Sequence, residues 1–144
     1  MTIGIFISEL LTKVLRDAED ENKELYRFLE NSLLFFDRMT ANVGHFHLQF
    51  MLKLSAFLGF QPYDIEELLE QIELDTERGV KFAFSFGHKK ILNQLYSAPY
   101  EADIEVPTIV KNAVLERVIR YYQLHEEHLG KLKSLIVLRE VFHS

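Results

Sequence analysis

The chain has 144 residues, of which 48% are hydrophobic and 12% aromatic, enough for one domain with a hydrophobic core. Its formal net charge of −6 argues against a domain whose whole surface binds nucleic acid. The absence of cysteine excludes disulfides, thiolate zinc sites and cysteine nucleophiles. With no signal peptide and no apolar run of about 18 residues, the sequence predicts a cytoplasmic protein without a membrane span. We expect residues 1–144 to form a single helical domain.

The first 60 residues predict three amphipathic helices, because apolar side chains recur every three or four positions. The first runs over residues 3–17, and the second carries its apolar face over residues 25–39. Asn42 is the predicted N-cap of the third helix. Gly59 is its predicted C-cap, because glycine adopts the left-handed conformation without a steric penalty.

Between the third helix and residue 87 the periodicity changes. Asp64 resembles the start of a capping box and predicts a short helix. The larger apolar residues then alternate strictly over residues 80–86, which is typical of a strand, and residues 72–74 are the predicted pairing partner. We therefore expect a small β-hairpin insertion near residues 72–86. It either packs on the helices through Phe82 and Phe86 or is partly mobile.

The second half of the chain predicts three further helices. A short helix follows Gly87, and an aperiodic loop with two prolines covers residues 97–107. A long helix then runs from Pro107 until Gly130 breaks it, and a last helix begins near Ser134. The expected fold class is mainly α, a compact bundle of about six to seven helices with the small hairpin insertion.

No catalytic or cofactor motif occurs in the sequence. It contains no glycine-rich phosphate loop, no nucleophile elbow and no paired catalytic acids, so we expect neither an enzyme nor a bound cofactor. His125 and His128 lie three residues apart and would share a helix face, but a metal site would need a third ligand. A stand-alone helical protein that binds a metal or a small ligand is therefore the alternative function.

Charge is unevenly distributed along the chain. Acidic residues dominate residues 62–79, where their spacing is typical of a solvated helix face and turn. Basic residues are more frequent after Pro107 and, together with two lysines upstream, predict a possible basic patch for phosphates or an acidic peptide. An ordinary mixed helix surface is the competing interpretation. The residues of the possible patch are Lys89, Lys90, Lys111, Arg117 and Arg120.

Three segments in this order resemble a known family. They are NVGHFHLQFMLKLSAFLGFQP, LDTERG and RVIRYYQLHEEHLGKLKSLIVLREVF. Together they resemble the C-terminal helical domain of the RecO family of recombination mediators, in particular its Bacteroidetes form. Among the residues that carry the resemblance, Tyr121, Tyr122 and His125 are interpreted as structural.

The resemblance implies a non-enzymatic role in DNA recombination and in the repair of DNA damage. It implies two protein partners, RecR and the tail of the single-stranded-DNA-binding protein. In that family an N-terminal OB-fold precedes this segment, so DNA would be bound weakly here or through that missing domain. Many members also carry four zinc-binding cysteines after the LGF-x-P motif. This chain has none, and no metal is inferred from the family.

The implied tail is acidic and ends in phenylalanine, so it needs an apolar pocket beside a cation. One candidate is the corner of the second and third predicted helices, with Arg38, Phe46, Phe50 and Lys53. The other is the C-terminal helix pair, with Lys131 and Lys133 beside Leu132 and Leu135. We favour the first because its aromatic residues would make a deeper pocket, although packing in the core is the alternative role for each of them.

Overall fold

The computed structural model describes residues 2–15, 22–40, 43–74, 84–126, 129–130 and 132–134. Its helices are α1 (Thr2–Val14), α2 (Lys23–Arg38), α3 (Phe46–Leu58), α4 (Ile65–Leu74), α5 (Phe86–Ser97) and α6 (Thr108–His125). One 3-10 turn, η1 (Val43–His45), directly precedes α3. These residues contain no strand, and the mainly helical prediction is confirmed.

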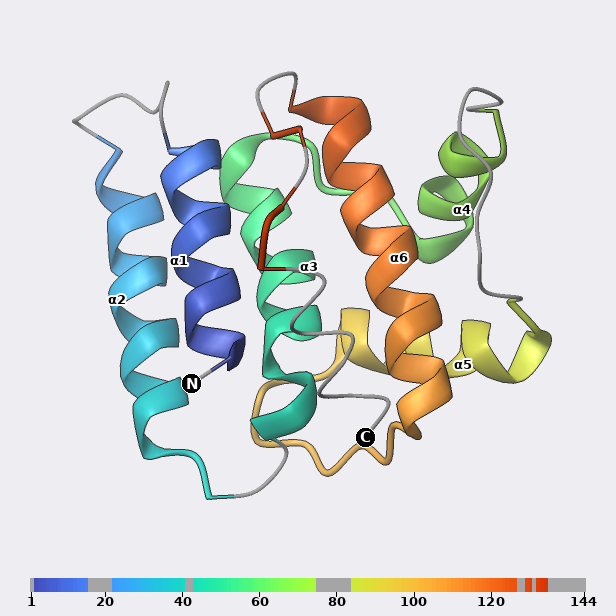
Figure 1. The fold of residues 1–144 in the computed structure, drawn as a ribbon, viewed down its shortest axis with the longest axis horizontal. Helices are drawn as coiled ribbons and strands as arrows, with labels where there is room; N and C mark the ends of the chain where they lie inside the picture. The colour runs from blue at the N-terminus through green and yellow to red at the C-terminus, as the bar shows by residue number, and fades with distance from the viewer. Residues whose placement is uncertain are drawn as a thin grey trace.

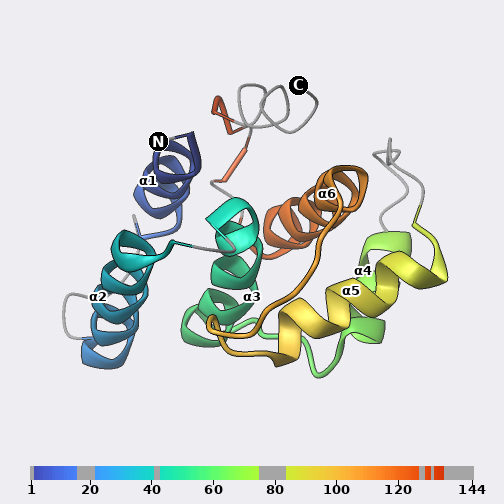
Figure 2. The same ribbon diagram turned by 90° about the horizontal axis from the view of Figure 1, so that it is seen from below.

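Helices α3 and α6 occupy the middle of the molecule. Figure 1 shows α1, α2 and α3 side by side, with α6 on the far side of α3. Seen from below, α4 and α5 lie together next to α6, away from α1 and α2 (Figure 2). Because α6 packs against α3, α4 and α5, every residue from 112 to 122 is buried.

The helix ends between α3 and α4 follow the predicted capping chemistry. Gly59 has φ +89°, the left-handed conformation of a C-cap, and the next amide, Phe60 N–H, donates to the Ser55 carbonyl at 3.0 Å. Asp64 Oδ1 accepts the Glu67 backbone N–H at 2.9 Å and so caps the first turn of α4. The connection between these helices is therefore fixed at both ends.

The predicted β-hairpin is not supported at its N-terminal end. Residues 72–74 form the last turn of α4 instead of a strand. Ile72 is buried together with Ile65 and Leu68, at the three-and-four spacing of one helical face. Burial of this face outweighs the short strand-like pattern that follows it.

At the C-terminal end of the predicted hairpin, Ser85 caps α5. Its side chain accepts the His88 N–H at 3.3 Å, and the His88 ring accepts the Ser85 N–H at 3.2 Å. Phe86, which we expected to pack, begins α5 and is 83% exposed, whereas Phe84 is partly buried against the core. The remaining hairpin residues, 75–83, lie outside the described part of the chain, Phe82 included.

Helix α6 ends earlier than predicted. It ends at His125, and Glu126 is extended, with φ −121° and ψ 101°. Beyond it, Leu129 and Leu132 are buried, with 1% and 4% of their surface exposed. The helix predicted to follow Ser134 and the predicted N-cap Asn42 lie outside the described residues.

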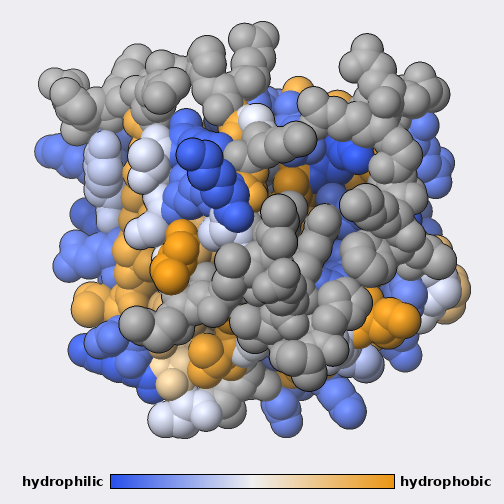
Figure 3. Space-filling view, viewed as in Figure 1, coloured by the Kyte–Doolittle hydropathy of each residue, from blue (hydrophilic) through white to orange (hydrophobic). Residues whose placement is uncertain are grey.

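The surface of the α1 and α2 side carries apolar side chains. Figure 3 shows hydrophobic surface over these two helices, broken by hydrophilic groups. Ile5 of α1 and Leu34 of α2 are 60% and 46% exposed. Within the described ranges, no helix has the length and apolar character needed to cross a membrane.

Candidate functional site: a pocket between α2 and α3

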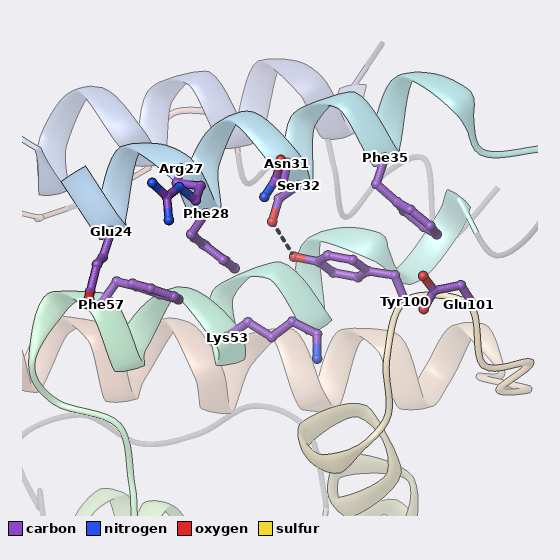
Figure 4. A pocket seen from close by; sticks show the side chains of 10 residues that line it. All are labelled: Glu24, Arg27, Phe28, Asn31, Ser32, Phe35, Lys53, Phe57, Tyr100 and Glu101. Carbon is purple, nitrogen blue, oxygen red and sulfur yellow. Dashed lines mark hydrogen bonds between the residues drawn. The ribbon is translucent and has the colours of Figure 1, made fainter.

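A pocket of about 530 Å³ lies between α2 and α3, closed on one side by the connection from α5 to α6. Figure 4 shows the side chains that line it converging from these three segments. The lining residues are Glu24, Arg27, Phe28, Asn31, Ser32, Phe35, Lys53, Phe57, Tyr100 and Glu101. Aromatic rings form most of the apolar surface of the pocket, and charged groups lie at its edges (Figure 4).

Helix α2 supplies the longest wall of the pocket. Asn22 caps this helix by accepting the Leu25 N–H at 3.1 Å, and the buried residues Leu25 and Leu29 hold it against the core. The lining residues of α2 recur at three- and four-residue spacing, so they share one face beside the buried one. Six side chains of one rigid helix thus point into the pocket: Glu24, Arg27, Phe28, Asn31, Ser32 and Phe35.

Stacked phenylalanines join α2 to α3 at one end of the pocket. The rings of Phe28 and Phe57 stack with their centroids 4.5 Å apart and an interplanar angle of 20°. Phe28 also stacks on Phe50, at 5.7 Å, below the pocket surface. Such offset aromatic pairs are stabilising beyond the area they bury. They make this end of the pocket a preformed apolar surface.

Tyr100 closes the other end. Its hydroxyl shares a hydrogen bond of 2.9 Å with Ser32 Oγ, and its ring packs on Phe35 and Phe46 at centroid distances of 5.2 and 4.9 Å. Burial raises the pKa of Tyr100 to about 12, with the Ser32 hydrogen bond acting in the opposite direction. The phenol is therefore neutral at physiological pH.

Lys53 is the cation on the α3 side. Its amine donates to the Ala98 carbonyl at 2.9 Å and lies 5.3 Å from the centroid of the Tyr100 ring. Burial lowers the pKa of Lys53, and the negative charge of Glu101 partly opposes that shift. Lys53 therefore contributes to the pocket and also anchors the connection that carries Tyr100.

The arrangement suits a small apolar group that carries a negative charge. An aromatic or aliphatic side chain would contact Phe28, Phe57 and Tyr100, and a carboxylate would reach Arg27 or Lys53. Two acids, Glu24 and Glu101, line the same pocket. The site is thus amphipathic, with both signs of charge at its edge.

The first sequence-predicted site is only partly assembled. Lys53 lines the pocket, whereas Phe46 and Phe50 are fully buried beneath it, each with 0% exposure. Arg38 is exposed at the end of α2 and is not among the lining residues. Core packing, the alternative role, therefore accounts for Phe46 and Phe50.

In the second sequence-predicted site, the described residues pack in the core or bind α1. Leu132 is buried, and the backbone N–H of Lys133 donates to Glu9 Oε2 at 2.7 Å. The Lys133 side chain is exposed. Lys131 and Leu135 lie outside the described residues.

The residues of the possible basic patch lie in different surroundings. Arg117 and Arg120 are only 7% and 9% exposed, so these two cannot contribute to an exposed patch. Arg117 pairs with Glu116 at 3.0 Å and lies 4.7 Å from the centroid of the Phe84 ring. Their burial follows from the central position of α6, which packs on three helices.

The three lysines of that patch also differ in their surroundings, although Lys89 and Lys90 are neighbours on α5. Lys89 forms an ion pair with Glu66 of α4, and Lys90 is exposed. Lys111 is half-buried, and burial lowers its pKa. A Cβ on Gly44 would meet Lys111 Nζ at 2.7 Å, so glycine at this position leaves room for the amine.

The histidine pair that carried the metal hypothesis is described only at His125. Its Nε2 is 2.7 Å from Gln71 Oε1, and its ring stacks on Phe60 at 5.0 Å. His128 lies outside the described residues. Among the described residues, no group of three or more histidine, aspartate or glutamate side chains is placed to hold a metal ion.

The comparisons with known proteins agree with the resemblance seen in the sequence. Residues 1–63 match the family model described as "Recombination protein O C terminal". A "DNA repair protein RecO" from Christiangramia forsetii is 32% identical over 150 residues, covering 99% of this chain and 62% of that protein. Nearly the whole chain is thus similar to RecO proteins, over about three fifths of their length. RecO proteins from Flavobacterium johnsoniae and Phocaeicola vulgatus are 31% and 30% identical, each covering 98% of this chain.

These RecO relatives come from Bacteroidetes, which confirms the predicted resemblance to the Bacteroidetes form of RecO. The chain spans about three fifths of their length, 62% and 61% for the first two. No solved structure shows a significant match to the chain.

The RecO family match includes the helices that build most of the pocket. Residues 1–63 contain α2 and α3, whereas Tyr100 and Glu101 follow the matched segment. Sequence reasoning missed Arg27, Phe28 and Tyr100. For Phe28 the signal was its place on the predicted apolar face, for Arg27 its position next to that face, and for Tyr100 an aromatic residue in a loop without helical periodicity.

Proposed function

We propose that this chain acts as a non-enzymatic, partner-docking helical domain of a recombination mediator in DNA repair. The family match supports the DNA-repair part, because the relatives carry the name "DNA repair protein RecO". The partners that the resemblance implies are the tail of the single-stranded-DNA-binding protein, RecR and DNA, the last bound weakly by this domain. RecR and DNA rest on the resemblance seen in the sequence alone.

The observation that carries the docking proposal is the aromatic pocket with a cation on each of two helices. The implied tail is acidic and ends in phenylalanine. Its terminal ring would lie against Phe28 and Phe57, and its carboxylates would meet Arg27 on α2 and Lys53 on α3. Both halves of such a ligand thus have a complementary surface within one pocket of about 530 Å³.

The expected affinity is modest. Burial of one aromatic side chain contributes roughly 1.5–3 kcal/mol, and charge-assisted hydrogen bonds at a partly exposed edge contribute about as much again. Ordering a flexible peptide opposes both contributions. The sum of about 6 kcal/mol at most corresponds to a dissociation constant of about 40 µM or weaker.

The proposal is tested by fluorescence anisotropy with a labelled peptide of several aspartates and a C-terminal phenylalanine. The peptide should bind this chain, and binding should weaken at high salt. A peptide without the terminal phenylalanine should not bind measurably. Arg27→Gln should weaken binding about two- to fivefold, the range of an exposed ion pair.

Arg38→Gln is the matched control, because Arg38 is also exposed on α2 but does not line the pocket. Its affinity should equal that of the unmodified chain. Absence of binding at protein concentrations of roughly 1 mM, or equal losses in Arg27→Gln and Arg38→Gln, would contradict docking in this pocket.

A further inference from the structure

The pocket between α2 and α3 contains two negative charges of its own. Glu24 lies at the Phe57 end, and Glu101 lies at the opposite end, next to Tyr100 (Figure 4). The negative charge of Glu101 acts on Lys53, because it raises the pKa of this lysine against the effect of burial. Neither Glu101 nor Lys53 forms an ion pair within 4.0 Å among the described residues, so the carboxylate stays at the pocket edge instead of binding the lysine.

The backbone that carries Glu101 is fixed on two helices. Glu101 lies in a turn in which the Ala102 N–H donates to the Pro99 carbonyl at 3.1 Å. From α3, the Gln49 amide donates to the Ala98 and Pro99 carbonyls, each at 3.3 Å. From α2, Ser32 holds the neighbouring Tyr100 hydroxyl. Movement of this turn away from the pocket would break the bonds to Gln49 and Ser32.

From this placement we infer that Glu101 is a built-in electrostatic antagonist that limits the affinity of the pocket for acidic peptides. A ligand carboxylate that approaches Lys53 must come close to the Glu101 carboxylate, which the turn keeps in place. Like charges at such a site repel, and the partly buried surroundings screen them less than water does. The inference rests on the proposed docking function and adds a residue that sets how tightly the partner is held.

Glu101 has the opposite effect on docking from the attractive residues of the pocket. Phe57, Arg27 and Lys53 provide attraction, so their removal weakens docking. Removal of the Glu101 charge should instead strengthen it. Specificity in binding sites commonly uses such repulsive elements together with attractive ones. We therefore expect the pocket to bind the acidic tail and to release it readily.

The test measures binding of the same aspartate-rich, phenylalanine-ended peptide to Glu101→Gln. Its affinity should rise about two- to fivefold at low ionic strength, the range measured for exposed charge pairs. At roughly 0.5 M salt, where the screening length falls to about 4 Å, the gain should shrink. A neutral peptide with the same terminal phenylalanine should show a smaller change.

Glu105→Gln is the matched control. Glu105 is exposed in the same connection between α5 and α6 but is absent from the pocket lining, so this variant changes the net charge equally. Its affinity should stay within error of the unmodified chain. If the unmodified chain binds and Glu101→Gln binds no more tightly than Glu105→Gln, the antagonist role is overturned while docking stands. If none of the three binds, both proposals fail.

Discussion

Two tyrosine hydroxyls hold the connection between α3 and α4 in place, and a third binds the middle of α3. Tyr122 donates to the Met51 carbonyl at 2.5 Å, Tyr121 donates to the Phe60 carbonyl, and Tyr96 donates to the Pro62 carbonyl at 2.7 Å. Burial raises the pKa of Tyr121 to about 12, so this hydroxyl keeps its proton throughout the physiological range. The structural role that the sequence predicted for Tyr121 and Tyr122 agrees with these contacts.

His47 makes the stability of the protein depend on pH. It is fully buried in α3 beside the Phe6 ring, and burial, with Lys111 and His45 nearby, lowers its pKa from 6.5 to about 3. In the unfolded chain the imidazole takes up a proton below pH 6.5, whereas in the fold it stays neutral, so stability falls as pH falls from 6.5 towards 3. Between pH 7 and 5.5 the loss should be about 1 kcal/mol.

Urea denaturation at these two pH values measures that loss. The variant His47→Gln has an uncharged side chain in both states, so its stability should depend less on pH over the same range. An equal pH dependence in the variant and in the unmodified chain would show that His47 is not the group responsible.

At the scale of elements, Glu9 joins α1 to the segment that follows α6. One carboxylate oxygen accepts the Lys133 N–H at 2.7 Å, and the other accepts the Ser134 N–H and hydroxyl at 2.8 and 2.7 Å. Burial raises the pKa of Glu9, but these hydrogen bonds outweigh that effect and hold it below 4.5. Its contribution to stability is therefore full above pH 4.5 and is lost as pH falls through the lower folded-state value.

Replacing this carboxylate should loosen the segment. The neutral amide of Glu9→Gln cannot accept all three hydrogen bonds as the carboxylate does. Because hydrogen bonds to charged groups are stronger than neutral ones, and because this site is partly exposed, we expect the free energy of unfolding to fall by about 1 kcal/mol at pH 7. Faster hydrogen exchange at the Lys133 and Ser134 amides, together with a lower urea midpoint, would show the effect. Glu30→Gln, an exposed acid of α2, is the control and should change neither. Unchanged exchange in Glu9→Gln would contradict the contact.

Helical periodicity predicted α1 to α6, because their apolar side chains recur every three or four positions and pack on neighbouring helices, although α6 is buried on every side from residue 112 to 122. It failed at residues 72–74, which are helical, and at residue 86, which begins α5 where alternating phenylalanines resembled a strand. Ser85 caps a helix there, and only tertiary contacts decide that Phe84 rather than Phe86 packs on the core. Alternation over so few residues does not distinguish a strand from the approach to a helix.

For the whole molecule, the sequence pointed to the same two helices that form the pocket, but to only one of the residues that line it. Lys53 was identified, yet Phe46 and Phe50 point into the core, and Tyr100 arrives from a loop some 50 positions away in the sequence. Which aromatic residue faces a pocket depends on how the helices and the α5–α6 connection pack together. Periodicity within one helix does not contain that information.

The central claim is that an acidic, phenylalanine-ended peptide docks between α2 and α3. The most direct measurement is a map of backbone amide chemical-shift changes on titrating the peptide into the isotope-labelled chain. The largest changes should occur at Phe28, Phe57 and Glu101, with little change at Lys133. Changes centred on Lys133 and α1, or no changes at saturating peptide, would contradict the account.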